Sequence, residues 1–380
     1  MSGSIEGQVA YSLFEGLLSP PPDDSPPVPG VAERWTTSGD GLEWTFHLRR
    51  DARWSNGDPV VAEDFRFAWL RLLRGDIAAD YVSFVRYLEN ARAFELLYKA
   101  MKPYIALRAV ASVLAAGVGV RADGDHVLRV RLQNPTPFFA DVAMFYTLFP
   151  VHRGSIAQHG HDDAFRAEHI VTNGPFRIKE GGYLRRNRIE LEQNPHYWDR
   201  AALGVAYVTY PIIEDGAARV TAFLDGRVDW ADDPPNNQLS ILAANPGFKS
   251  GPQLGTYYFR LNVTDPTLSD VRVRRALSLA LNRRELCRCT LDDLYLVSTG
   301  FTPSMPGYDA LDRVAYDPEQ ARRLLAEAGF PEGRGFPRLE ILYNTSENHR
   351  VIAQFVQDQW RTELGIDVAL LNQEWKVYLS

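Results

Sequence analysis

Apolar and polar side chains alternate in two short segments of the first third of the chain. Trp44, Phe46 and Leu48 are separated by polar residues, and residues 126–133 repeat the pattern with apolar residues between arginines. Successive side chains of a strand point to opposite faces of the sheet. Both segments are therefore predicted to be strands with one buried face.

Between these two segments the spacing changes to that of a helix. Residues 56–59 read Asn-Gly-Asp-Pro, which is a turn signal. Phe65 and Trp69 then lie one helical turn apart, and Glu63 and Asp64 precede them. Negative charge is favoured at a helix N-terminus, so a helix is predicted to begin here. The succession of strand, turn, helix and strand predicts a small α+β domain.

The middle of the chain carries shorter β patterns separated by turn residues. Asn173 and Gly174 are expected to serve a turn with a structural role, and a helix is predicted at residues 215–224 with Gly226 as its stop. Short strands are predicted at residues 177–180, 189–191 and 205–212.

The last third has the clearest alternation of helices and strands. Asp270 and Asp317 precede apolar periodic segments and are predicted to cap two helices, because a carboxylate accepts hydrogen bonds from the N–H groups of a first turn. A strand at 339–343, a helix at 351–364 and a strand at 366–370 follow one another directly. This unit predicts two parallel strands joined by a right-handed crossover. The fold class predicted for the whole chain is α/β of the mixed α+β kind.

Length and charge limit the classes of function. At 380 residues the chain is expected to form two or three domains. A net charge of -7 gives no electrostatic reason to bind nucleic acid or anionic membranes. The 8 Trp, 17 Tyr and 19 Phe suit cores, and also pockets for amphipathic ligands.

Neither a catalytic motif nor a cofactor motif is recognised. The chain has no GxSxG, HExxH, P-loop or GxGxxG sequence. Four histidines lie between His152 and His169 beside several carboxylates, a composition that could bind a transition metal. Their spacing matches no closed zinc pattern, so no metal and no cofactor are predicted.

Nine sequence blocks, in one order, cover nearly the whole chain. The two most extended are WTFHLRRDARWSNGDPVVAEDFRFAW at residues 44–69 and YNTSENHR…NQEW at 343–375. In this order and spacing the blocks resemble solute-binding protein family 5, the periplasmic oligopeptide- and dipeptide-binding proteins that feed ATP-driven importers. The other blocks are LFEGLL (13–18), PGVAERW (29–35), VTNGPF (171–176), EQNPHYW (192–198), TYYFRLN (256–262), DVRVRRALSLALNR (270–283) and LLAEAGF (324–330).

The resemblance implies an architecture. It is a clamshell like the type II periplasmic binding proteins, with an extra small α+β domain and two lobes that close on the ligand by a hinge. Residues 1–13 would be a remnant of the first lobe and 14–136 the small inserted domain. Residues 137–258 would be the first lobe, and 259–380 the N-terminal part of an incomplete second lobe. Family members extend beyond both ends of this chain, so a chain shortened at both ends is expected.

The resemblance also implies which residues meet the ligand. Tyr81 matches a position whose ring lines the cleft from the small domain, and Tyr258 matches one near the peptide backbone. His349 matches a histidine that can meet the peptide carboxyl terminus, and Asp232 and Asp233 lie in a segment that borders the cleft. The residue types alone leave other roles open: a core tyrosine, a histidine at a helix N-terminus, and acidic residues that face solvent.

The function that the resemblance implies is a receptor that captures peptides and delivers them to the permease subunits of an ABC-type importer, without catalysis. Such a receptor holds the backbone groups and termini that all peptides share. A nickel chelate, an opine or an oligosaccharide are alternative ligands. A truncated interaction or sensor fragment that does not transport is the alternative from another class, and an enzyme has the least support. A monomer is expected, in the periplasm or extracellular and membrane-associated, although no export signal is recognised in this chain.

Overall fold

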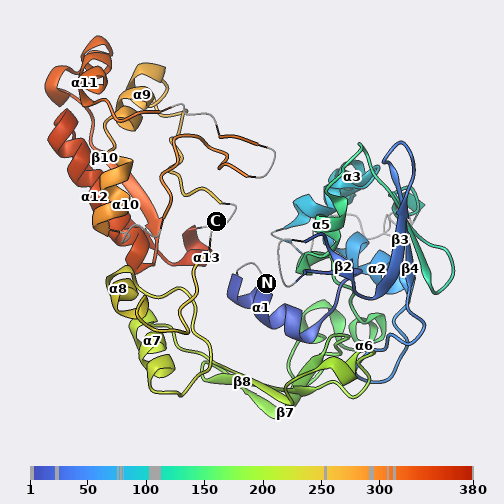
Figure 1. Ribbon diagram of the computed structural model, residues 1–380. Helices are drawn as coiled ribbons and strands as arrows, with labels where there is room; N and C mark the ends of the chain where they lie inside the picture. The colour runs from blue at the N-terminus through green and yellow to red at the C-terminus, as the bar shows by residue number, and fades with distance from the viewer. Residues whose placement is uncertain are drawn as a thin grey trace. The chain divides into compact units, whose positions relative to one another are not determined.

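The protein is described by a computed structural model that covers residues 4–21, 25–74, 77, 79, 81–101, 113–251, 255–290, 295–305, 308–310 and 314–378. The chain divides into two compact units, Met1–Ile212 and Ile213–Ser380. Both units contain helices and strands (Figure 1), which confirms the predicted mixed fold class. The finer division at residues 13, 136 and 258 stays a prediction.

A four-stranded antiparallel sheet organises the first unit. Trp44, Phe46 and Leu48 are buried, as their alternation predicted, and helix α2 (Ala62–Leu72) packs on strands β5 (Val120–Ala122) and β6 (Val127–Arg131). The order across the sheet is β3 (Ala32–Thr37), β4 (Glu43–Leu48), β6 (Val127–Arg131) and β5 (Val120–Ala122).

Asp64 does more at the start of α2 than add negative charge. Its side chain is buried and accepts hydrogen bonds from Val61 N at 3.0 Å, from Trp54 Nε1 at 3.2 Å and from Arg153 Nε at 2.8 Å. One carboxylate thus ties the helix N-terminus to two distant segments, and these bonds stabilise its buried charge.

A second antiparallel sheet follows in the order β7 (Phe176–Leu184), β8 (Arg188–Gln193) and β9 (Tyr207–Pro211). β7 extends beyond the predicted strand because the register shifts between Ile178 and Tyr183, which lets the pairing with β8 continue. The other elements of the unit are α1 (Ser4–Leu13), the paired β1 (Leu18–Ser19) and β2 (Val28–Pro29), η1 (Val82–Tyr87), α3 (Ala91–Met101), α5 (Phe139–Ala143), η3 (Tyr146–Leu148), α6 (Arg153–Asp163) and η4 (Arg200–Ala202).

The turn at Asn173 and Gly174 joins the start of the chain to its middle. Asn173 Nδ2 donates to Glu15 O at 2.9 Å, and Glu15 N donates to Asn173 Oδ1 at 3.2 Å. Gly174 N donates to Leu13 O at 2.9 Å. The two segments thus pair through three hydrogen bonds, which is the structural role expected for this turn.

The second unit contains the predicted parallel pair, β10 (Leu339–Asn344) and β11 (Val368–Gln373), joined by helix α12 (Glu347–Leu364) (Figure 1). Trp360 of α12 is buried, and its Nε1 donates to Leu277 O at 2.8 Å. The other elements are α7 (Gly216–Leu224), η5 (Asn236–Gln238), α8 (Leu239–Leu242), α9 (Val271–Leu279), α10 (Arg283–Thr290), α11 (Pro318–Glu327), η6 (Pro331–Gly333) and α13 (Trp375–Tyr378).

The predicted caps of α9 and α11 are confirmed, but the predicted start of α12 was wrong. Asp270 accepts from Arg272 N, and Asp317 accepts from Gln320 N, both at 2.8 Å. α12 begins at Glu347, four residues before the predicted residue 351, because Ser346 caps it by accepting from His349 N. β11 likewise begins at Val368, two residues later than predicted.

In the part of the chain that the structure describes, no helix combines the length and the apolar character needed to cross a bilayer. α12 has 18 residues, but it buries only one face.

Candidate ligand-binding site

Four of the five residues predicted to meet the ligand belong to the second unit. Asp232, Asp233, Tyr258 and His349 lie after residue 213, whereas Tyr81 belongs to the first unit. Within the second unit the structure brings Asp233 and His349 close enough for the charge of Asp233 to act on the imidazole.

The segment that follows Asp233 is fastened to the first turn of α12. Asn236 N donates to Asn348 Oδ1 at 3.1 Å, and Arg219 Nη2 donates to the backbone oxygen of Asp233 at 3.3 Å. Asp233 is exposed and has a φ of 45°, in the left-handed region that Asp tolerates better than most residues. The turn therefore places the carboxylate of Asp233 on the side of the second unit where α12 begins.

His349 is uncharged at neutral pH and is oriented by one side chain. Its Nδ1 lies 2.5 Å from Asn344 Oδ1, and an amide oxygen only accepts, so Nδ1 carries the ring proton. Burial lowers the pKa of His349, and the charge of Asp233 opposes this with a smaller effect. Nε2 therefore offers a lone pair to a ligand.

Tyr257 is a neighbour of His349 that the sequence did not indicate. The two rings lie 5.1 Å apart, and burial raises the pKa of Tyr257 to about 12. Tyr258 instead contacts Phe301, at a ring distance of 4.9 Å. The TYYF sequence was the available signal, but it could not tell which of its two tyrosines lies against the histidine.

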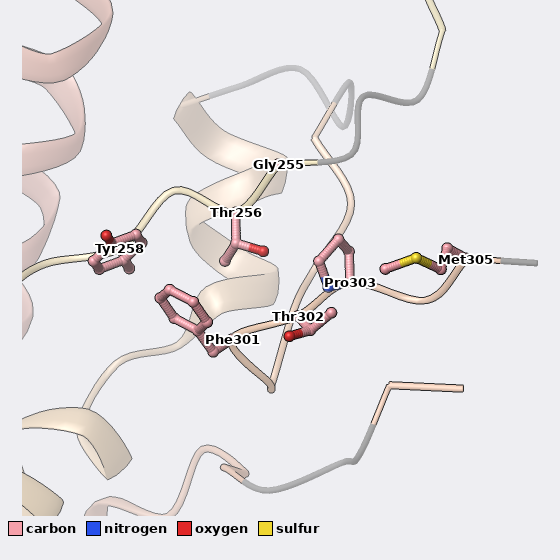
Figure 2. Close-up of a pocket in the computed structure, with 7 residues that line it drawn as sticks. All are labelled: Gly255, Thr256, Tyr258, Phe301, Thr302, Pro303 and Met305. Carbon is pink, nitrogen blue, oxygen red and sulfur yellow. The ribbon is translucent and has the colours of Figure 1, made fainter. Parts of the chain in front are cut away.

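Tyr258 forms one wall of an open hollow of about 290 Å³ in the second unit (Figure 2). Tyr258 and Phe301 are 45% and 70% exposed, so both rings are available to a bound group. The residues that line the hollow are Gly255, Thr256, Tyr258, Phe301, Thr302, Pro303 and Met305.

Several buried polar atoms of the second unit have no hydrogen-bond partner within the described part of the chain. An unpaired buried polar group costs about 1–3 kcal/mol, so such atoms are rare unless water or a ligand completes them. All of these atoms lie between residues 219 and 256, the stretch that contains Asp232 and Asp233 and ends two residues before Tyr258. They are Arg219 Nε, Asn236 Nδ2, Gln238 Oε1 and Thr256 Oγ1.

Tyr81 belongs to an aromatic cluster of the first unit. It lies directly before η1, and its ring packs edge-on against Phe145 at 5.6 Å and Tyr146 at 6.1 Å. The side chain is partly exposed, so packing and ligand contact are both compatible with its position.

The first unit also contains a buried carboxyl group that sequence reasoning missed. Glu15 accepts from Tyr197 Oη and from Trp198 Nε1, each at 2.7 Å, and burial raises its pKa to about 7. Arg49 stacks over the Trp198 ring at 3.6 Å. Glu15, Arg49 and the Tyr197–Trp198 pair belong to three different blocks of the nine that resemble the family. Membership of these blocks was the only feature of the sequence that linked them.

Two of the four histidines considered as metal ligands contact other residue types, and the other two stack on each other. His152 Nε2 lies 2.9 Å from Asp58 Oδ2, His161 contacts Arg71, and the rings of His159 and His169 stack at 3.9 Å. Among the residues that the structure describes, no three His, Cys, Asp or Glu side chains are placed to hold a metal ion.

Residues 26–380 match the family described as "Bacterial extracellular solute-binding proteins, family 5 Middle". The periplasmic oligopeptide-binding protein OppA of Escherichia coli (strain K12) is 33% identical over 394 residues, which cover 100% of this chain and 68% of that protein. The periplasmic murein peptide-binding protein MppA of the same organism is 33% identical over 390 residues, with coverage of 100% and 68%.

Solved structures agree with this match. The periplasmic oligopeptide-binding protein OppAIV of Borrelia burgdorferi is 28% identical with a TM-score of 0.88, over 100% of this chain and 73% of that one. Haemophilus influenzae OppA, in complex with RPPGFSPFR, is 31% identical with a TM-score of 0.81 and the same coverage. The predicted likeness to periplasmic binding proteins is thereby confirmed. This chain belongs to family 5 of the bacterial extracellular solute-binding proteins.

Proposed function

We propose that this protein is an extracytoplasmic receptor that captures peptides and delivers them to an ABC-type importer. The observation that carries the proposal is the match, along the whole chain, to an oligopeptide-binding protein in complex with a peptide. The proposal includes binding without bond-making, permease subunits as partners, a monomeric state and a position at the outer side of the membrane. It also includes the finer domain division into residues 1–13, 14–136, 137–258 and 259–380.

We assign ligand contact to Tyr81, Asp232, Asp233, Tyr258 and His349. The unpaired polar atoms of the second unit support this assignment for the residues of that unit, because a peptide backbone supplies both donors and acceptors along its length. The hollow beside Tyr258 can take a side chain, while water completes the contacts that differ between ligands.

Calorimetric titration tests the function directly. We expect saturable heat with a mixture of di- to pentapeptides, and none with a nickel chelate, an opine or an oligosaccharide. A relative in Escherichia coli with 30% identity bears the name "Probable deoxycholate-binding periplasmic protein YgiS", so deoxycholate is a further control. Heat from one of these ligands with none from any peptide would contradict the proposal.

Binding of a peptide carboxylate at His349 is expected to take up a proton. A neutral imidazole with a free lone pair cannot form an ion pair with a carboxylate, so the ring must first be protonated at Nε2. Affinity is therefore expected to fall as pH rises above the pKa of His349, by about tenfold, which is the worth of one charge-assisted contact.

Calorimetry in two buffers of different ionisation enthalpy measures this proton uptake. His349→Gln should bind without that uptake, and a peptide with an amidated C-terminus should show none with the unaltered protein. The same proton uptake in His349→Gln would show that another group is responsible.

A further inference from the structure

The hollow beside Tyr258 has walls suited to one ring-bearing side chain. Two aromatic rings, a proline and a thioether line it, together with two threonines and a glycine. We propose that it is the subsite for one aromatic side chain of the ligand, with the hydroxyl group of Thr256 as partner for a polar tip. The proposal rests on the proposed function, and it adds a side-chain preference at this position.

The size of the hollow supports a single side chain as occupant. Its volume of about 290 Å³ lies just below the range of about 300–1,000 Å³ for small-molecule sites. That space accommodates one ring and its linker but not a whole oligopeptide. A peptide bound in the second unit would therefore place one residue here and continue elsewhere.

The two rings are arranged to receive a third ring. Tyr258 and Phe301 meet at 4.9 Å with an interplanar angle of 64°, an edge-to-face geometry that leaves ring surface open. Phe301 is 70% exposed, which is high for a phenylalanine side chain. Each Å² of apolar surface covered by a ligand contributes about 25 cal/mol, so covering these rings favours binding.

Thr256 provides the polar element. Its Oγ1 is buried and has no hydrogen-bond partner among the described residues, although the side chain as a whole is partly exposed. Figure 2 shows Thr256 across from Phe301, with its oxygen directed toward the side where Pro303 lies. A rotation about its Cα–Cβ bond exchanges hydroxyl and methyl, so a phenol in the hollow can complete this group.

The positive charge of Arg260 disfavours a basic side chain of the ligand in the hollow. The guanidinium of Arg260 lies 5.9 Å from the centroid of the Tyr258 ring, so the face of this ring already interacts with a cation. A lysine or arginine side chain of the ligand that approached the Tyr258 ring would meet this like charge. A neutral aromatic side chain avoids this repulsion.

Titrations with substituted trialanine peptides test the subsite. Tyr, Phe, Leu or Lys replaces alanine at one position at a time, and calorimetry gives each affinity. At one of the three positions we expect Phe to bind about tenfold tighter than Ala, Tyr about threefold tighter than Phe, and Lys no tighter than Ala. Peptides that bind with no such preference at any position would overturn the subsite alone, whereas failure of every peptide to bind would overturn the proposed function.

Two single substitutions test whether the preference for aromatic side chains arises at Phe301 and Thr256. Phe301→Ala should abolish the advantage of Phe and Tyr over Ala, while Tyr207→Ala, which alters a ring of similar exposure (66%) in the first unit, should leave it intact. Thr256→Val keeps the shape of the side chain and should make Tyr bind like Phe. An unchanged aromatic advantage in Phe301→Ala, or an unchanged preference for Tyr in Thr256→Val, would contradict the assignment. Because Phe301 is exposed, its replacement should not impair folding, and the midpoint of denaturant unfolding checks this.

Discussion

Gly174→Ala is expected to destabilise the first unit by about 3 kcal/mol or more. A Cβ at this position would lie 2.6 Å from Phe14 N and 2.7 Å from Leu13 C. Both atoms are backbone atoms, so no side-chain rotation relieves the contact. The chain would have to separate, which would also weaken the bond from Gly174 N to Leu13 O.

Denaturant unfolding measures this loss as a shift in the midpoint. Gly39→Ala is the matched control in the same unit, because a Cβ there meets no atom within 4 Å and the backbone has no positive φ. It should change the free energy of unfolding by less than about 0.5 kcal/mol. Similar midpoints for both variants would show that the close approach at Gly174 is tolerated.

The second large expected effect is a dependence of the free energy of unfolding on pH, which is caused by Glu15. Its carboxyl group has an ordinary pKa of 4.5 in the unfolded chain and about 7 in the folded protein, because burial disfavours the charged form. Between these pH values the folded state holds a proton that the unfolded state has lost, so raising the pH favours unfolding. The free energy of unfolding should therefore fall by about 3 kcal/mol from below pH 4.5 to above pH 7, and the contribution of Glu15 should then stay constant.

Glu15→Gln isolates this contribution from those of other titrating groups. The amide keeps the contacts, because its oxygen can accept from Trp198 Nε1 while its nitrogen donates to Tyr197 Oη. Denaturant unfolding at a series of pH values should show the variant more stable than the unaltered protein above pH 7 and alike below pH 4.5. The same pH dependence in both proteins would mean that Glu15 keeps an ordinary pKa.

Local patterns in the sequence predicted several elements correctly because their causes are local. The alternation at Trp44, Phe46 and Leu48 matches the pleat of β4, which buries those side chains. Asp270 and Asp317 cap helices through bonds to residues two and three positions ahead. The start of α12 was missed because residues 347–350 are polar and show no apolar period. Ser346 was the available signal, since its side chain caps the helix.

Local patterns in the sequence predicted less of the candidate ligand-binding site. The resemblance indicated Asp232, Asp233, Tyr258 and His349, and the structure brings Asp233 near His349. It could not indicate that Tyr257 lies beside His349, or that Phe301 faces Tyr258, because these contacts depend on how separate segments approach one another. The roles of the five predicted residues in binding stay predictions.

By itself the sequence determined the fold class, the positions of the helices and strands with a clear side-chain period, and the resemblance to family 5. These depend on side-chain period, on capping and on the order of sequence blocks, all of which are properties of the linear chain. Only the tertiary structure decided the protonation of His349, the raised pKa of Glu15 and the hollow between Tyr258 and Phe301. Burial and charge depend on neighbours from remote parts of the chain: Glu15 is 182 residues away from the tyrosine that donates to it. No periodicity along the sequence encodes such an approach.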